Sequence, residues 1–260
     1  MPPNNRPPRL LFWLLPLLPI ALGLGLFFTR QQVSSFLALN EASQILPNWT
    51  WAAFTFLGNG WGLFAIAFPL LIIAPRVLSA GIFAGVFTAA ISSTLKPLLN
   101  LPRPSGVLVE GSFFRYGDML LTNSMPSGHT LTAFSVATAI FFSAKPTYRK
   151  PLLLLFLLAI FVGISRSALG VHWLSDVLVA AGLGFWCGLI GAYLAAKIPS
   201  KQLLANRWWP RFIAVGGLVT IYILLNSALD FADNLHLQNI GVIFIALTLI
   251  IFGLRQKIAS

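Results

Sequence analysis

The run WLSDVLVAAGLGFWCGLIGAYLAA, residues Trp173–Ala196, decides the fold class of this chain. It contains one charged side chain, Asp176, close to its first residue. A helix of roughly 20 mostly apolar residues is long enough to cross the hydrocarbon of a bilayer. A surface helix of a soluble protein would instead carry a polar face along its whole length. The run therefore predicts a membrane-spanning helix.

Further apolar runs lie on both sides of it, and eight spanning helices are predicted in all. Three of the runs are short and need an extra turn from their flanks: His129–Ala144, Leu152–Ala168 and Ile240–Leu254. The first run resembles a secretory signal, but no small-residue cleavage site follows it, and we interpret it as a span. The eight runs are Leu10–Phe28, Trp49–Ala74, Val77–Leu95, His129–Ala144, Leu152–Ala168, Trp173–Ala196, Phe212–Leu229 and Ile240–Leu254.

The composition supports a membrane protein. Of the 260 residues, 57% are hydrophobic and only 9% are charged, whereas a soluble domain has about 25% charged residues. This excludes a soluble two-domain protein and a disordered chain, and a single cysteine excludes a disulfide scaffold. The predicted fold class is an all-α integral membrane protein, a bundle of about eight transmembrane helices.

The net charge of +11 would suggest a nucleic-acid partner in a soluble protein. Here the charges fall in short blocks between apolar runs, so they are expected to orient the chain in the membrane, with no nucleic acid bound. A cytoplasmic N-terminus puts most basic residues inside and all six acids outside. The inside basic residues are then Arg6, Arg9, Arg76, Lys145, Arg149, Lys150, Lys197, Lys201, Arg207, Arg211, Arg255 and Lys257.

Three polar clusters fall on the outer side in this topology. They read KPLLNLPRP from Lys96 to Pro104, PSGH from Pro126 to His129, and SRSALGVHWLSD from Ser165 to Asp176. Nothing in the order of the apolar runs forced the three clusters to meet at one surface, so this agreement is evidence that they form a single site.

Each cluster offers groups that suit a phosphate. Lys96, Arg103 and Arg166 supply positive charge, and the guanidinium fork matches phosphate oxygens. Pro126 is expected as the first residue of a helix. Ser127 and Gly128 would then present free backbone N–H groups, which form an anion site at a helix N-terminus.

The histidines offer the chemistry. His172 and Asp176 are four residues apart, so they are neighbours on a helix face, and the carboxylate can fix the imidazole tautomer. The other ring nitrogen is then free to attack phosphorus. His129, from another helix, is placed to protonate a leaving oxygen.

Plainer structural interpretations exist for each residue taken alone. A lone Lys or Arg near a span end usually extends to the lipid head groups. We interpret Gly58-Asn59-Gly60 and Cys187 as helix packing, and we assign no role to His236. In the long outer loop 96–127, an apolar patch either enters the lipid interface or packs on the bundle; its residues are Phe113, Phe114, Tyr116, Met119, Leu120 and Leu121.

Together, the clusters form an ordered signature, K-x6-R-P, P-S-G-H and S-R-x5-H-x3-D, with every fixed position present. This signature resembles the type-2 phosphatidic acid phosphatase superfamily, which also includes vanadium haloperoxidases. The resemblance implies a six-helix phosphatase core over residues 1–200. Residues 201–260 would be two additional transmembrane helices of unknown role.

The resemblance also implies a role for each matched residue. His172 would be the nucleophile that forms a phosphohistidine, Asp176 would orient it, and His129 would be the general acid and then the base. The phosphate would be held by Lys96, Arg103, Ser127, Gly128 and Arg166. No metal and no cofactor are implied.

The expected activity is that of a metal-independent lipid phosphatase, a phosphoric monoester or diphosphate hydrolase. Its site would face the periplasm or cell exterior from the bacterial inner membrane. The first substrate expected by family analogy is undecaprenyl diphosphate; the alternatives are phosphatidylglycerol phosphate, phosphatidic acid and lipid A phosphates. A lipid-to-lipid phosphotransferase would use the same residues. A transporter or scaffold would lack the nucleophile or the acid, and a haloperoxidase would need bound vanadate.

Overall fold

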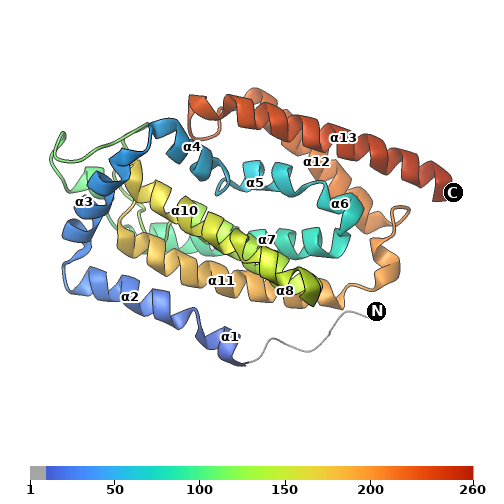
Figure 1. The fold of residues 1–260 in the computed structure, drawn as a ribbon, viewed down its shortest axis with the longest axis horizontal. Helices are drawn as coiled ribbons and strands as arrows, with labels where there is room; N and C mark the ends of the chain where they lie inside the picture. The colour runs from blue at the N-terminus through green and yellow to red at the C-terminus, as the bar shows by residue number, and fades with distance from the viewer. Residues whose placement is uncertain (1–9, 260) are drawn as a thin grey trace.

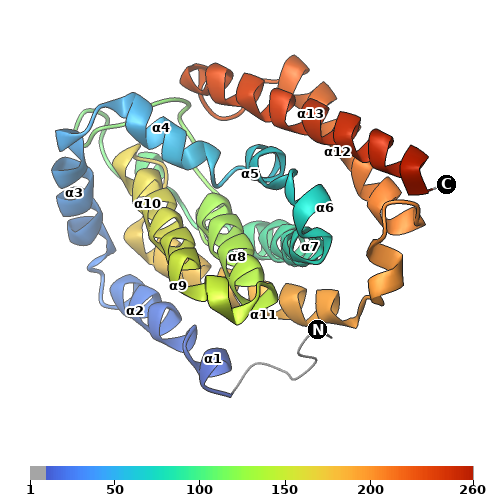
Figure 2. The same ribbon diagram turned by 45° about the vertical axis from the view of Figure 1, so that its right-hand side comes forward.

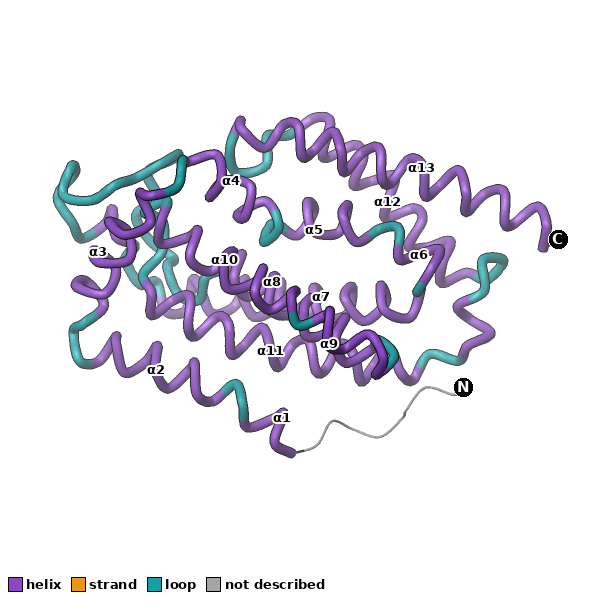
Figure 3. The backbone as a smooth tube through the Cα atoms, in the orientation of Figure 1, coloured by secondary structure: helices purple, strands orange, loops and turns teal. Residues whose placement is uncertain are grey.

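The structure is a computed structural model that describes residues 10–259. Arg6 and Arg9, which entered the charge-based orientation, lie outside the described residues. Within the described part of the chain all regular structure is helical, and the loops collect mainly at the two ends of an elongated bundle (Figures 1 and 3). The predicted all-α fold class is confirmed.

The helices have the following bounds. The short ones are α1 (Leu10–Leu14), α6 (Leu70–Ile73) and α9 (Arg149–Leu152). The longer ones are α2 (Leu17–Phe28), α3 (Gln32–Ala42), α4 (Asn48–Phe56), α5 (Gly60–Ala67), α7 (Pro75–Leu99), α8 (Gly128–Ser143), α10 (Leu154–Ala168), α11 (Leu174–Lys197), α12 (Trp208–Asn226) and α13 (Leu235–Ala259).

Helix α11 is the centre of the bundle, with α2, α7 and α8 packed around it (Figure 2). Small residues make these crossings close. A Cβ atom on Gly184 would lie 2.5 Å from the carbonyl oxygen of Leu131 on α8, and one on Gly191 would lie 2.5 Å from that of Ala80 on α7. Small residues that bring backbones together are typical of helix packing in membranes. Cys187 is buried among them, in agreement with its interpretation as a packing residue.

The predicted span Trp49–Ala74 is not one helix, and this interpretation was wrong. It is divided into α4, α5 and α6, and the Gly58-Asn59-Gly60 segment forms the first break. Asn59 is the N-cap of α5, where its side-chain oxygen accepts from the backbone N–H groups of Trp61 and Gly62. Such capping satisfies amides that a helix start leaves unpaired. Gly58 lies directly against His129, since a Cβ atom there would be 2.8 Å from the histidine Cβ.

Six helical stretches within the described residues are long and apolar enough to cross a membrane, so the predicted count of eight is not confirmed. The broken α4–α6 segment accounts for one of the differences. Helix α8 accounts for the other, because its 16 residues are fewer than a span usually needs. The six stretches are Leu10–Phe28, Pro75–Gly106, Pro146–Ala168, Leu174–Lys197, Ser200–Asn226 and Ala232–Gln256.

Helices α12 and α13 lie side by side and form a hairpin along one edge of the bundle (Figures 1 and 2). Their apolar faces pack on α5, α6 and α7 in one core cluster that includes Phe68, Leu224 and Ile245, each fully buried. The turn of the hairpin, with a 3₁₀ helix at Ala232–Asn234, reaches α4 at the end where the α3 and outer loop segments lie.

Part of the apolar patch in the outer loop packs on the bundle, as one of the two predictions expected. Phe113 packs edge-on against Phe36, and Tyr116 stacks on Phe231. The backbone N–H of Phe114 donates to the side chain of Asn40 on α3. By contrast, Met119, Leu120 and Leu121 are exposed.

Candidate active site

The three polar clusters meet at one end of the bundle, where α7 and α10 end and α8 and α11 begin. Helix α8 starts later than predicted. Pro126 lies outside the helix, Ser127 is the N-cap and Gly128 is the first helical residue. His172 also lies just outside a helix, because Trp173 is the N-cap of α11.

The contacts of His172 define its tautomer. Nδ1 lies 3.2 Å from Oδ2 of Asp176, and Nε2 lies 3.2 Å from Nη1 of Arg103. A guanidinium has only donors, so Nε2 must accept and Nδ1 must carry the hydrogen, donating it to Asp176. The imidazole therefore presents the lone pair of Nε2 toward Arg103. Burial, followed by the charges of Arg103 and Lys96, lowers the pKa of His172 well below its ordinary value.

Asp176 is held by three donors on the same oxygen. Besides His172, the Ser124 hydroxyl donates to Oδ2 at 2.5 Å and the backbone N–H of Trp173 donates at 3.0 Å. Ser124 is fully buried, and Asp176 is 1% exposed. The carboxylate is thus fixed from both the outer loop and the start of α11.

Arg103 and Lys96 converge on the loop that precedes α8. Arg103 donates through Nε to the carbonyl oxygen of Thr122 at 2.8 Å, and through Nη1 to that of Val171 at 3.1 Å. Its Nη2 and the Lys96 ammonium both donate to the carbonyl oxygen of Asn123, at 3.3 and 3.2 Å. Asn123 has a left-handed backbone, φ 56°, which only a few residue types adopt readily. This backbone directs one carbonyl at two cations.

Arg166 and the start of α8 form the other side of the site. Arg166 is 5% exposed and donates through Nη1 to the hydroxyl of Thr55 at 3.2 Å. Its Nε is buried without a hydrogen-bond partner among the described residues. Ser127 is buried, and its backbone N–H donates to the carbonyl oxygen of Asp176. This amide is therefore not free for an anion, and that part of the prediction was wrong. Gly128 follows Ser127 at the first helical position, where backbone amides are free for an anion.

His129 faces a carboxylate that the sequence did not reveal as part of the site. Its Nε2 lies 2.9 Å from Oδ1 of Asp230, in the turn between α12 and α13. The distance is that of an ion pair, although the ring N–H is not aligned for a regular hydrogen bond. Burial alone would raise the pKa of the Asp230 carboxyl, but its neighbours His129 and Arg166 lower it to about 2. Asp230 is therefore a carboxylate at neutral pH.

Comparison with known proteins identifies the family of this chain. The sequence model described as the PAP2 superfamily matches residues 76–200. The crystal structure of LpxE from Aquifex aeolicus is similar to 61% of this chain and 93% of its own, with 31% sequence identity and a TM-score of 0.54. The chain belongs to the PAP2 superfamily.

Other known proteins are also similar to it. A transmembrane PAP2-type phosphatidylglycerolphosphate phosphatase from Bacillus subtilis has a TM-score of 0.52 at 22% identity, covering 73% of this chain and 96% of its own, and supports the fold. Lipid A 1-phosphatases of Rhizobium johnstonii and Porphyromonas gingivalis are 32% and 36% identical. These alignments cover 49% and 36% of this chain, and 52% and 22% of the relatives. The chain thus spans about half the length, or less, of these curated relatives.

An apolar groove of about 800 Å³ runs beside the PAP2 site, between α5, α7, α8 and α12. Asn59 and Thr132 line it together with apolar side chains such as Phe64, Val136 and Phe212. His129, Thr132 and Val136 are spaced i, i+3 and i+7 along α8, so they share one face of the helix. Thr132 and Val136 line the groove, so this face of α8 connects His129 with the groove.

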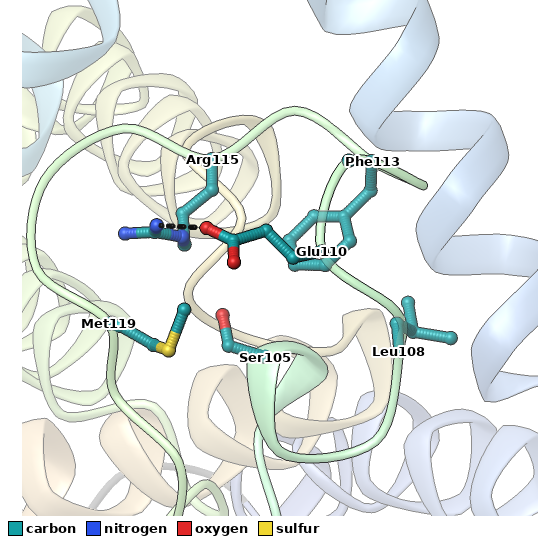
Figure 4. Close-up of a pocket in the computed structure, with 7 residues that line it drawn as sticks. Ser105, Leu108, Glu110, Phe113, Arg115 and Met119 are labelled. Atoms are coloured by element: carbon teal, nitrogen blue, oxygen red, sulfur yellow. Dashed lines mark hydrogen bonds and ion pairs between the residues drawn. The ribbon is translucent and has the colours of Figure 1, made fainter.

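A second, smaller cavity of about 210 Å³ lies within the outer loop and is separate from the PAP2 motifs (Figure 4). Figure 4 shows Arg115 and Glu110 pointing toward each other across it, with Ser105 and Met119 on the opposite side. The ion pair between Arg115 and Glu110 is 3.5 Å long, and the Glu110 side chain is 77% exposed. An exposed pair of this kind contributes little to stability.

Proposed function

We propose that this PAP2 protein is a membrane lipid phosphatase, a metal-independent hydrolase of phosphoric monoesters or diphosphates that acts through a phosphohistidine at His172. The observation that carries the proposal is the orientation of His172. Its Nδ1 donates to a buried carboxylate, and its Nε2 faces Arg103. A lone pair directed at a cation lies where a bound phosphate would bring its phosphorus.

In the first step, Nε2 of His172 attacks phosphorus and the bond from phosphorus to the leaving oxygen breaks. His129 gives its proton to that oxygen, so the lipid leaves as a neutral alcohol, or as a lipid monophosphate when the substrate is a diphosphate. Lys96, Arg103, Arg166 and the Gly128 amide hold the phosphoryl oxygens and stabilise the charge of the five-coordinate state. Asp176 compensates the positive charge that develops on His172.

In the second step, His129 takes a proton from water, and the water oxygen attacks the phosphohistidine. The bond between Nε2 and phosphorus breaks, and inorganic phosphate is released. His129 is then protonated again for the next turnover.

The substrate proposed is a lipid phosphate whose apolar chain lies in the groove beside His129. The leaving group carries that chain, and the groove begins on the face of α8 that bears the general acid. The relatives named lipid A 1-phosphatase favour a lipid A phosphate over undecaprenyl diphosphate, which family analogy alone had put first. We therefore rank the 1-phosphate of lipid A first and undecaprenyl diphosphate second.

We further propose that the site lies at the periplasmic or outer face of the inner membrane, with the phosphatase core over residues 1–200 and the helical hairpin over 201–260 as an addition. The excess of basic residues on the predicted cytoplasmic side supports this orientation.

A phosphate-release panel on the purified protein tests the proposal. Lipid A, undecaprenyl diphosphate, phosphatidylglycerol phosphate and phosphatidic acid are compared in one detergent, with His172→Ala as the control. Release from at least one lipid, lost in His172→Ala, is expected. Transfer of phosphate to a second lipid without free phosphate would identify a phosphotransferase, and no turnover of any lipid phosphate would refute the proposal.

A further inference from the structure

The hairpin α12–α13 lies outside residues 76–200, the part of the chain that matches the sequence model of the family. Its turn nevertheless reaches the site, because Asp230 approaches His129. The backbone of Asp230 has an unusual conformation. Asp230 has φ 60°, in the left-handed region, which residues other than glycine seldom adopt, although Asn and Asp adopt it more easily than the rest. Backbone strain that the surroundings hold in place is typical of functional positions.

The surroundings of Asp230 hold it firmly. Leu229 and Phe231 on either side are 7% and 9% exposed. Phe231 stacks on Tyr116 of the outer loop, with ring centroids 5.4 Å apart. Gln238 of α13 accepts from the backbone N–H of Leu229 and donates to the carbonyl oxygens of Leu224 and Ser227. The turn is therefore fastened to both helices of the hairpin and to the loop above the site.

The side chain of Asp230 points inward, and only 16% of it is exposed. Its Oδ1 lies 2.9 Å from His129 Nε2, and its Oδ2 accepts from Nδ2 of Asn59 at 2.9 Å. Asn59 is itself fixed as the N-cap of α5. The carboxylate thus bridges the break in the α4–α5 segment and the catalytic histidine.

The other charged groups near His129 are cations. Arg166 on α10 and Lys96 on α7 both oppose a positive charge on the ring, whereas Asp230 favours one. A general acid that protonates a leaving oxygen is an imidazolium, with hydrogens on both nitrogens. Nε2 is the buried nitrogen and faces Asp230, which leaves Nδ1 to exchange a proton with the leaving group and later with water.

We propose that Asp230 is a positioning residue for His129: it orients the ring through Nε2 and balances the charge of its acid form, so that the C-terminal hairpin completes the leaving-group side of the active site. This rests on the proposed phosphatase function. It gives the two histidines matching arrangements, since each has a carboxylate on one nitrogen and the substrate on the other. It also gives the hairpin a role in the reaction.

The test compares Asp230→Asn and Asp230→Gly, both of which accept a left-handed backbone, on a lipid monophosphate and on an aryl phosphate. We expect each variant to lower kcat on the lipid about 10- to 100-fold, part of the usual contribution of a general acid. The loss on the aryl phosphate, whose leaving group needs little protonation, should be within about threefold for phosphoenzyme formation. Asp233→Asn is the matched control, because Asp233 lies in the same turn but accepts a hydrogen bond from the Tyr116 hydroxyl and does not contact His129. This variant should keep wild-type rates.

A double-mutant comparison separates positioning from folding. In a His129→Gln background, Asp230→Asn should cost less than about twofold, since the residue through which it acts is gone. Equal losses on both substrates, or a full loss in the His129→Gln background, would overturn the inference and indicate a structural role. Full activity of Asp230→Asn or Asp230→Gly on the lipid would also overturn it. An inactive wild type on every substrate would instead refute the phosphatase function itself.

Discussion

Asp176→Asn is the substitution whose effect the geometry defines best. All three donors to Asp176, from Ser124, Trp173 and His172, bind Oδ2. An asparagine that places its oxygen there keeps all three hydrogen bonds, and with them the tautomer of His172. The variant therefore removes the negative charge and leaves the arrangement intact.

The size of the expected rate loss follows from the distance between the His172 ring and the Asp176 carboxylate. A full charge on His172 Nδ1, 3.2 Å from Oδ2, would interact with the carboxylate by about 5 kcal/mol at an effective dielectric constant of about 20. If about half of that charge has developed in the transition state, the variant loses about 2.5 kcal/mol, a rate reduction of about 10².

The assay is rapid-quench formation of the phosphoenzyme from a radiolabelled aryl phosphate, at saturating substrate. Asp118→Asn, the same change at an exposed site in the outer loop, should have no effect. A loss of about 10⁴ or more would mean that the tautomer is not retained. A loss below about threefold would mean that Asp176 does not act on the nucleophile at all.

Four further outcomes are expected. Activity should survive excess EDTA and be inhibited by vanadate, a mimic of the five-coordinate state; loss in EDTA that Mg²⁺ restores would contradict a metal-free site. With Cys187 removed, a cysteine at Ser112 should react with an impermeant thiol reagent in intact cells and one at Thr147 should not; the reverse pattern would invert the topology. His129→Gln should reduce turnover of a lipid monophosphate toward about 10⁴-fold, yet give a burst of leaving group and a trapped phosphoenzyme with an aryl phosphate; equal losses without a burst would mean that His129 only binds phosphate. Because the pKa of His172 is lowered, its neutral form persists below the ordinary value of about 6.5, and phosphoenzyme formation should keep its rate as the pH falls from 7 to 6; a decline centred near 6.5 would show an ordinary, solvated imidazole.

The sequence predicted the parts of the site that are local. His172 and Asp176 are four residues apart. Lys96 and Arg166 lie in the last turns of α7 and α10, and Arg103 lies in the loop after α7, so their positions follow from spacing and from the order of the apolar runs. The structure brings them together as expected, although His172 precedes the helix and Pro126 lies outside one. Their catalytic roles stay predictions until they are tested.

The contacts that the sequence could not reveal are formed between distant segments. Ser124 is an unremarkable serine in a long loop, and its bond to Asp176 spans 52 residues. Asp230 lies in the turn of a hairpin beyond the matched region, and nothing in its neighbours distinguishes it from a solvated acid. Asn59 lay within an apolar run that continues on both sides, so the break at α5 was hidden. The one available signal was the pair of glycines around Asn59, which favour a helix end as much as close packing.

The groove between α5, α7 and α12 opens sideways, since Val86, Phe212 and Val215 along it are more than half exposed. A substrate chain that enters there arrives from the plane of the bilayer. The concentration that governs the rate is then the mole fraction of lipid phosphate among its neighbouring lipids, and the aqueous concentration has no direct effect. Diluting the substrate with inert lipid or detergent, at constant bulk amount, should slow the enzyme in proportion once the substrate is below saturation. On this proposal, catalysis is a two-dimensional process, with rates that depend on the composition of the membrane.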